Sequence, residues 1–477
     1  MDDLIRVTRI AVTAALSLFS AGHALLFKRD PRSAFGWIVV SLTLPLIGPF
    51  LYWTMGVNRI RRRARHWLES GRRLAGWASF PERSGDEIAQ KLPLWGEHLV
   101  ELRRLSDRVA SFPLVPGNRI VPLRNGERAY PAMLEAIANA RHSIHLSTYI
   151  FDGDTTGRLF TDALAEAADR GVEVRVIVDS LGEKYSRPTA RKLLKHSKVK
   201  VGRFLPLTQG GYVNLRNHRK ILIVDGHSAF TGGMNIGGRH MMQGRSAASP
   251  VVDVQFSVEG PGVGDLQRVF LGDWYFVTGE LLNEPHLFPL ILPAGPVLAR
   301  AISDGPDKEF RKLQMIIVGA LACARQRVMI MTPYFIPDRP LISALVTTAL
   351  RGVAVSLILP VQNNLPFVHW ATRAYLCELL QQGIKVFYQP PPFVHTKLFL
   401  VDGVWSLIGS ANLDPRSLRL NFELDLETYG RELTALLERH FLETVVVSRE
   451  VTLAEMEGRA LPERLRDAAA KLFSPYL

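Results

Sequence analysis

Two long stretches without a charged side chain open the sequence. Residues 10–27 make up 18 such positions, and residues 34–58 make up 25. About 20 apolar residues are enough for a helix to cross the roughly 30 Å of hydrocarbon in a bilayer. The six residues between the stretches are polar and include Pro31, which favours a tight turn. The pattern therefore predicts an N-terminal transmembrane helical hairpin.

Two features of these stretches leave alternatives open. Pro45 and Pro49 interrupt the second stretch, where proline could kink a helix or turn it back as a re-entrant segment. Arg6 and Arg9 precede the first stretch, as basic residues precede the apolar part of a cleaved signal peptide. Because a second apolar stretch follows at once, the anchored hairpin is favoured over the signal peptide.

The rest of the chain alternates helical and extended periodicity, and it does so twice. In each half a helix, a strand, a second helix and a second strand follow in the same order. The first set is at residues 130–141, 143–151, 159–170 and 172–178, and the second is at 310–325, 328–334, 341–351 and 353–359. This alternation predicts an α/β protein with two pseudo-symmetric α/β/α sandwich domains.

Domain limits follow from the same patterns. Residues 1–65 hold the predicted hairpin and a basic flank, and residues 66–112 have the pattern of a charged helical connector. We expect the first α/β domain at residues 113–285 and the second at residues 300–477, which ends in a helical tail.

One motif occurs in each half with identical spacing. It consists of a His, a Lys, an Asp and an Asn: His218, Lys220, Asp225 and Asn235, then His395, Lys397, Asp402 and Asn412. One copy would be a weak signal, whereas two copies in similar surroundings indicate a duplicated domain that presents two histidines to one site. Such a pair suits a reaction in which one imidazole attacks and the other protonates.

The spacing also predicts local geometry. Residues two apart on a strand share a face, so each His is expected beside its Lys. Each motif Asp precedes Gly, a dipeptide typical of two-residue hairpin turns. Such a turn puts Gly233 opposite His218, where a small residue leaves room for a ligand. It likewise puts Ser410 opposite His395, and it brings each motif Asn onto the face of its His. The motif Asp residues fit turn formation best, with catalysis as the alternative.

A phosphodiester is the substrate class that these groups suit. It is anionic and repels nucleophiles, so its reaction depends on charge neutralisation and alignment. The Lys and Asn side chains can hold its free oxygens, a neutral imidazole can attack phosphorus, and an imidazolium can protonate the departing alkoxide. Asp253 and Glu423 are candidates for orienting the rings, against a role as ordinary strand carboxylates. No cluster has metal-ligand spacing, so neither a metal nor another cofactor is expected.

The charge distribution bears on partners and orientation. A net charge of +13 indicates an anionic partner such as nucleic acid, acidic lipid or a phosphate-bearing substrate. Residues 1–65 hold ten Lys or Arg against three Asp; seven of the basic residues flank the outer ends of the predicted hairpin and three lie in its loop. The positive-inside rule then puts both ends, and the catalytic domains, in the cytoplasm. No strip of aromatic and basic residues favours nucleic acid.

Both motif copies satisfy the pattern HxKxxxxD, so the chain resembles the phospholipase D superfamily. Other stretches are similar to bacterial cardiolipin synthases: Thr-Pro-Tyr-Phe-Ile-Pro at 332–337, residues 409–417, Asn-Phe-Glu at 421–423, and Lys-Arg-Asp-Pro at 28–31 before a membrane segment. The resemblance covers nearly the whole chain.

This resemblance implies a multi-pass enzyme of the bacterial inner membrane with phosphatidylglycerol and cardiolipin as its lipid partners. It would pass a phosphatidyl group from one phosphatidylglycerol to another, with a phosphohistidine on the first-copy His218 and with His395 as acid and base. The alternative is a hydrolase of the same superfamily, a phospholipase or a nuclease, in which water resolves the intermediate. A non-catalytic lipid-binding or scaffold protein would not need two intact motifs. The oligomeric state stays open.

Overall fold

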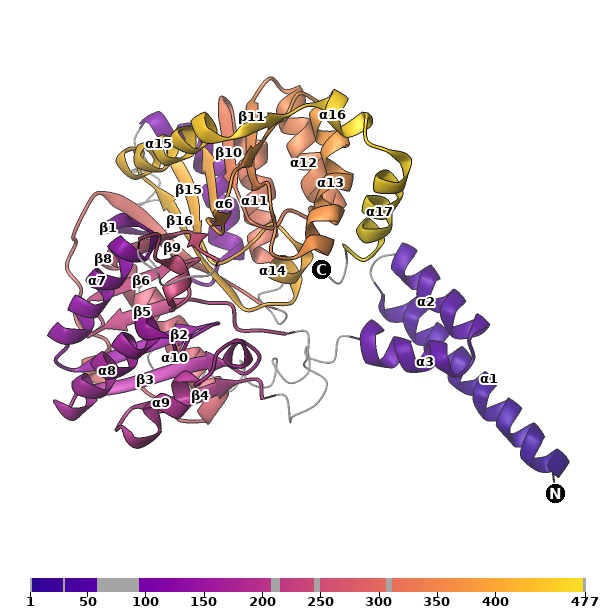
Figure 1. Cartoon of the computed structure of the whole chain (residues 1–477), viewed down its shortest axis with the longest axis horizontal. Coiled ribbons are helices and arrows are strands. Elements are labelled where there is room, and N and C mark those ends of the chain that lie inside the picture. Colours follow the sequence, from indigo (N-terminus) through magenta and orange to yellow (C-terminus); the bar gives the residue numbers. More distant parts are fainter. Residues whose placement is uncertain are drawn as a thin grey trace. The chain divides into compact units, whose positions relative to one another are not determined.

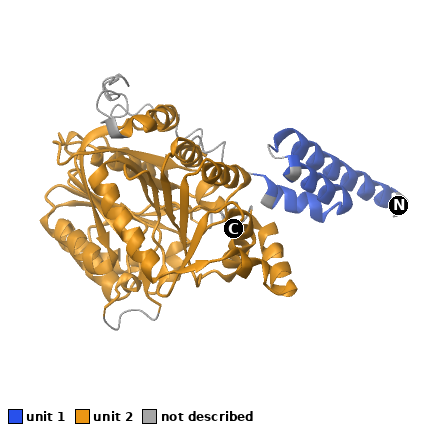
Figure 2. Ribbon diagram, turned by 90° about the horizontal axis from the view of Figure 1, so that it is seen from above, with its two compact units in different colours: residues 1–66 blue, residues 67–477 orange. Residues whose placement is uncertain are grey.

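The computed structural model describes residues 2–28, 31–57, 94–206, 215–243, 249–305 and 311–474. The chain divides into two compact units, Met1–His66 and Trp67–Leu477 (Figure 2). The N-terminal unit contains α1 (Asp2–Phe27), α2 (Pro31–Thr43), α3 (Ile47–Leu51) and the π-helical turn η1 (Tyr52–Gly56). Within the described residues, one helix, Leu4–Phe27, is long and apolar enough to cross a membrane.

The second predicted spanning helix does not form as one continuous helix. Within the apolar stretch at residues 34–58, helix α2 ends at Thr43, the chain bends through Pro45, and helix α3 follows. The last residue of the stretch lies outside the described part. Proline lacks a backbone N–H and clashes with the preceding turn, so a break at Pro45 is the expected local outcome. The single helix expected across residues 34–58 is therefore replaced by shorter helices on either side of Pro45.

The larger unit is built on one continuous sheet with the order β17-β12-β11-β10-β14-β15-β16-β9-β1-β8-β6-β5-β2-β3-β4. From the central antiparallel β9–β1 pair outwards, equivalent strands of the two halves follow in the same order, apart from the extra β17. The two halves are therefore related by pseudo-two-fold symmetry. The first half contributes β1 (Val115–Arg124), β2 (Ser143–Thr148), β3 (Glu173–Asp179), β4 (Lys200–Phe204), β5 (Ile221–Val224), β6 (Ser228–Gly232) and β8 (Val254–Glu259).

The second half repeats that set. Its strands are β9 (Val297–Asp304), β10 (Arg327–Met331), β11 (Ala354–Pro360), β12 (Lys385–Gln389), β14 (Leu398–Val401), β15 (Trp405–Gly409), β16 (Glu423–Tyr429) and β17 (Arg449–Val451). A separate two-stranded sheet joins the halves, because β7 (Val251–Val252) pairs in parallel with β13 (Phe393–Val394).

Helices cover both faces of the sheet, as the alternating pattern predicted (Figure 1). In the first half, α7 (Asn125–Asn139) and α8 (Thr155–Asp169) share a core with alternate residues of β2, β3 and β5. The residues between these face α10 (Val263–Thr278): His145 of β2, for example, stacks on Phe270 of that helix. The two-domain α/β/α interpretation of the sequence is thus confirmed.

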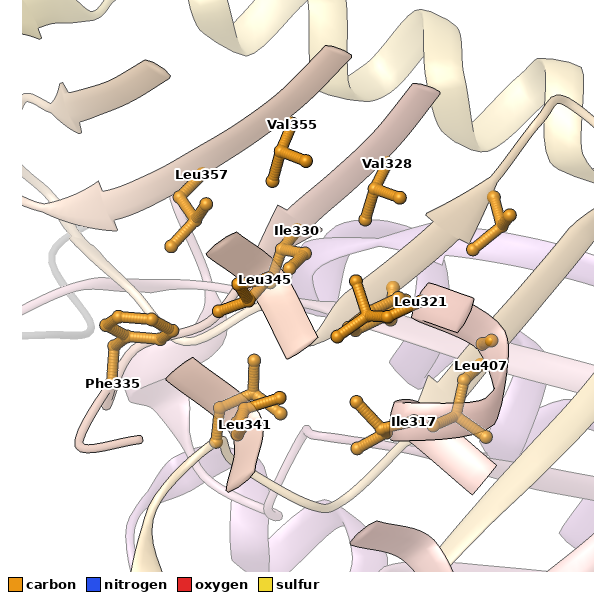
Figure 3. Packing of buried hydrophobic residues seen from close by; sticks show 14 of the residues in the cluster. Ile317, Leu321, Val328, Ile330, Phe335, Leu341, Leu345, Val355, Leu357 and Leu407 are labelled. Carbon is orange, nitrogen blue, oxygen red and sulfur yellow. The ribbon is translucent and has the colours of Figure 1, made fainter. Parts of the chain in front are cut away.

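The second half has the same layers and the larger core. Helices α11 (Lys312–Cys323), α12 (Arg339–Leu350) and α13 (Pro366–Leu380) pack on one face, and α15 (Arg431–Val447) contacts β10, β12, β14 and β15. In Figure 3, Ile317 and Leu321 of α11 and Leu341 and Leu345 of α12 face the side chains of β10 and β11. Burial of each such side chain contributes about 1.5–3 kcal/mol to the stability of this half.

Other helices of this unit lie outside the repeated pattern. Within the expected connector, the structure describes the 3-10 helix Leu94–Leu99 and α6 (Val100–Val109). Helix α6 packs so closely on α11 that a Cβ added to Gly319 would lie 2.3 Å from Leu105. The predicted helical tail is present as α16 (Leu453–Glu457) and α17 (Leu461–Leu472), which packs against α13.

The predicted hairpin register is wrong by one residue. In the first half Val224 pairs with Ser228, and in the second half Val401 pairs with Trp405, so three residues rather than two form each turn. Each motif Asp and the Gly after it take positive φ angles, between 52° and 71°. Ser410 and Gly233 are consequently not the partners opposite His395 and His218.

Candidate active site

The two motif histidines lie just before strands rather than inside them. His218 precedes β5 and His395 precedes β14. The backbone of each histidine is held by a hydrogen bond to the backbone of the opposite half. The N–H of His218 donates to the carbonyl of Phe422 at 2.9 Å, and the N–H of His395 donates to that of Val252 at 2.8 Å. Both halves therefore set the position of each ring.

The acidic partners of the rings are exchanged between the halves. His218 Nδ1 lies 3.0 Å from Glu423 Oε2, and His395 Nδ1 lies 2.9 Å from Asp253 Oδ2. Both carboxylates are fully buried. A carboxylate on Nδ1 holds the proton there and leaves Nε2 free to act on a substrate. The sequence pointed to these two residues, but not to which ring each would contact.

Ser410 and Gly233 make room for these carboxylates. The Ser410 hydroxyl donates to Glu423 Oε2 at 2.6 Å, and the Asn421 amide donates to Glu423 Oε1 at 3.1 Å. A Cβ at Gly233 would lie 2.7 Å from Asp253 Oδ2. The expectation that these small residues open space for a ligand is replaced by a positioning role, since both adjoin the acid that orients a ring.

The motif lysines lie beside their histidines, as the spacing predicted. Lys220 and Lys397 are buried, and each Nζ donates to the carbonyl of the His two residues earlier. Burial lowers the pKa of Lys220 to about 7 and that of Lys397 to about 8. Lys397 Nζ is also 2.9 Å from His395 Nδ1, which cannot accept there while donating to Asp253. We assign the Nδ1 proton to the carboxylate bond because charge-assisted bonds are the stronger ones.

Burial and the lysines keep both imidazoles neutral. Burial is the main cause that lowers the pKa of His218, and Lys220 adds to it against the opposing charge of Glu423. Burial, followed by Lys397, Lys220 and His218, lowers the pKa of His395 well below its usual value. Burial alone would raise the pKa of Glu423, but the charge and hydrogen bond of His218 bring it below its usual value. Burial raises the pKa of Asp253.

The motif Asp residues point away from the rings. The Asp225 carboxylate accepts from the backbone N–H groups of residues 141–143 at 2.7–2.9 Å. The Asp402 carboxylate accepts from those of residues 325–327 at 2.8–2.9 Å and also contacts His98 at 2.8 Å. Each Asp thus ties its hairpin turn to the start of the neighbouring strand. This geometry favours the turn-forming role over the catalytic one.

The two motif Asn residues are held differently. Asn235 Oδ1 accepts from the N–H of Ile150 at 3.0 Å. The Asn412 amide donates to Ser417 Oγ at 3.3 Å, and within the described residues its buried Oδ1 has no hydrogen-bond partner. The role of both amides as phosphate ligands stays a prediction.

Residues outside the motif also adjoin the two histidines and their acids. Tyr149 and Tyr334 approach the rings of His218 and His395 edge-on, with centroids 5.4 and 6.3 Å apart. Arg219 is buried, pairs with Asp273, and donates to the carbonyl of Glu423 at 3.1 Å. It therefore links the halves beside the site. The second motif copy has Thr396 at the matching position, so the two copies differ here.

Two His-Lys pairs from duplicated α/β halves, each ring oriented by the other half's acid, define a phospholipase D-like protein. The family model described as "Cardiolipin synthase, PLD-like domain" matches residues 133–255 and 317–445, and the chain belongs to this family. A second model, described as "Phospholipase_D-nuclease N-terminal", matches residues 15–56.

Individual relatives extend the similarity along the chain. The chain is 31% identical over 467 residues to a cardiolipin synthase of Geobacillus sp. (strain WCH70), covering 96% of this chain and 92% of the relative. It is 30% identical to cardiolipin synthase 1 of Bacillus anthracis, covering 94% and 90%. The crystal structure of a phosphatidylserine synthase from Haemophilus influenzae Rd KW20 has the same fold. Its TM-score is 0.63 at 15% identity, covering 79% of this chain and 100% of that one.

Proposed function

We propose that this protein is a cardiolipin synthase of the membrane. It takes a phosphatidyl group from one phosphatidylglycerol and transfers it to a hydroxyl of a second, which yields cardiolipin and glycerol. The main support for this proposal is the near full-length similarity to cardiolipin synthases, together with two buried imidazoles that each bind a carboxylate of the other half.

The first half-reaction forms a phosphohistidine. His218 Nε2 attacks phosphorus while Nδ1–H donates to Glu423. The N–P bond forms, and the bond from phosphorus to the oxygen of the headgroup glycerol breaks. His395, as the imidazolium, gives its Nε2 proton to the departing alkoxide. A bound phosphodiester anion raises the pKa of this ring and of both motif lysines, which supplies the protonated acid and the cations.

The second half-reaction reverses these steps with a different alcohol. Neutral His395 removes the proton from the hydroxyl of a second phosphatidylglycerol, and that oxygen attacks phosphorus. The N–P bond breaks and His218 is restored. Lys220 and Lys397, with Asn235 and Asn412, hold the free phosphoryl oxygens through both steps. Asp253 stabilises the charge that forms on His395 in this step.

The membrane is the natural place for this chemistry. Both substrates are insoluble lipids, and α1 is apolar enough to anchor the protein beside them. We assign the protein to the bacterial inner membrane, with the catalytic domains in the cytoplasm because basic residues crowd the flank at residues 59–65.

Product analysis tests the function directly. The purified full-length protein is incubated with radiolabelled phosphatidylglycerol in mixed micelles, and the lipids are separated. Cardiolipin with an equal amount of glycerol supports the transferase, whereas phosphatidic acid without cardiolipin identifies a hydrolase. The matched control is His218→Ala, which is expected to give neither product.

A further inference from the structure

The N-terminal unit folds its second apolar stretch back on itself. Gly48 of α3 lies against α2, where an added Cβ would be 2.1 Å from the Val40 carbonyl oxygen. Further along, the rings of Trp37 and Tyr52 are 5.5 Å apart. As the chain continues from Gly48 to Tyr52, its contact on α2 moves back from Val40 to Trp37. Residues 47–56 therefore run antiparallel to α2.

The same segment runs parallel to α1. Ser17 Oγ donates to the Pro45 carbonyl at 3.1 Å, and at the other end Lys28 Nζ donates to the Gly56 carbonyl. Between them, Trp53 Nε1 donates to Ser20 Oγ at 3.0 Å. Residue 56 therefore lies level with the end of α1. At 1.5 Å per residue, the path from Ser17 to Lys28 along α1 is about 16 Å, roughly half of the hydrocarbon thickness.

The bend between α2 and α3 is compatible with a lipid environment. The exposed side chains of the bend and of α3 include the apolar residues Leu44, Leu46, Ile47 and Phe50. Several backbone groups of the bend have internal partners: Ser17 Oγ donates to the Pro45 carbonyl, and the N–H of Gly48 donates to the Leu44 carbonyl at 2.7 Å. Non-helical backbone at membrane depth requires such internal partners.

We infer that this unit crosses the bilayer once, through α1, and that residues 34–57 enter it from one face and leave through the same face. The inference rests on the proposed membrane location. It puts the N-terminus on one side and both the loop at residues 28–33 and the chain beyond residue 57 on the other. A two-span hairpin would instead put the N-terminus and the catalytic domains together.

The distribution of basic residues fits the re-entrant path better than the hairpin. With re-entry, Arg6 and Arg9 stand alone on the N-terminal side. Eight basic residues then share the other side: Lys28, Arg29, Arg32, Arg59, Arg61, Arg62, Arg63 and Arg65. The hairpin divides the same residues seven to three. By the positive-inside rule the catalytic domains stay cytoplasmic in both cases, but the N-terminus moves to the outer face.

Site-specific labelling separates the two topologies. In the full-length chain with Cys323 and Cys377 replaced by Ser, single cysteines are introduced as Asp2→Cys, Ser33→Cys and Asp169→Cys. Spheroplasts are treated with a membrane-impermeant maleimide before or after permeabilisation. We expect only the cysteine at position 2 to react in intact spheroplasts, and those at 33 and 169 to react after permeabilisation. Reaction at 33 with protection at 2 would overturn the inference, as would protection at all three positions.

Two glycine variants test the fold-back contact itself. Gly48→Leu removes the close approach to Val40, whereas Gly36→Leu adds the same side chain where nothing lies within 4 Å of a Cβ. In the Ser33→Cys background, Gly48→Leu is expected to let part of the population span twice and react at position 33 in intact spheroplasts, while Gly36→Leu stays protected. Equal protection in both variants would mean that this contact does not hold the re-entrant form.

These results are independent of the enzyme assay. Cardiolipin formation with a hairpin labelling pattern would reject the re-entrant topology and keep the proposed function. The re-entrant labelling pattern without cardiolipin formation would keep the re-entrant topology and reject the proposed function.

Discussion

His218 Nδ1 lies 3.0 Å from Glu423 Oε2, although 205 positions separate the two residues in the sequence. The reciprocal contact joins His395 of the second half to Asp253 of the first at 2.9 Å. Each half thus supplies a ring for one contact and an acid for the other. The site is complete only when both halves are folded together, which gives the duplication a chemical reason.

Loss of the Glu423 charge is the first test of this relationship. Glu423→Gln keeps the shape of the side chain but no longer stabilises positive charge on His218, so kcat is expected to fall about 10²–10⁴-fold. The comparison variant is Ser410→Ala, which removes one hydrogen bond to the same carboxylate and is expected to cost about tenfold or less. Steady-state kinetics on both variants measure this. Equal activity of Glu423→Gln and the unaltered protein would remove the acid from the mechanism.

The motif lysines are expected to act on the phosphate. Lys220→Ala or Lys397→Ala removes one cation from the transition state and is expected to lower kcat/KM by about 10²–10³-fold. Unchanged kcat/KM in either variant would show that this lysine does not contact the reacting phosphate.

The lowered lysine pKa values also predict a pH dependence. In the free protein, Lys220 with a pKa of about 7 and Lys397 with a pKa of about 8 lose their charge as the pH rises through those values. Binding of an anionic lipid should weaken over that range, so kcat/KM is expected to decline from about pH 7 upwards. Lys397→Arg keeps its charge at every accessible pH, so only the loss of the Lys220 charge remains and the decline of kcat/KM through pH 8 is expected to be shallower. Superimposable profiles would contradict the assignment.

Asp402 separates a structural role from a catalytic one. Its carboxylate accepts three backbone N–H groups at the start of β10, and leaving these without a partner costs about 1–3 kcal/mol. Asp402→Ala is therefore expected to lower the midpoint of thermal unfolding while the folded fraction keeps its kcat. Asp225→Ala, which disrupts the matching turn, is the parallel case. A loss of kcat in fully folded protein would restore the catalytic interpretation.

Much of the fold could be predicted because it depends on local and periodic features. The repeated order of helices and strands and the pairing of each His with its Lys followed from spacing alone. The hairpin register did not, because Asp-Gly is compatible with a three-residue turn as well as a two-residue one. Because of this one-residue shift in register, Ser410 contacts the Glu423 carboxylate instead of lying opposite His395.

Two further features depend on contacts between distant segments, which spacing does not encode. Either ring could have been oriented by Asp253, and only the joined sheet brings it to His395. The apolar length of residues 34–58 satisfies a spanning helix and a folded pair equally well. The close approach at Gly48 and the bond from Ser17 to Pro45 distinguish them, and both require the tertiary structure.

The most direct test is to count and map the covalent intermediate. The purified protein and its His218→Ala and His395→Ala variants are quenched during turnover of labelled phosphatidylglycerol, and the adducts are located by mass spectrometry. One imidazole attacks phosphorus, and the other transfers protons to the leaving oxygen and from the attacking hydroxyl. We therefore expect at most one phosphatidyl group per chain, on His218, and none in His218→Ala. Two adducts on one chain, or one that persists on His395 when His218 is absent, would contradict the account.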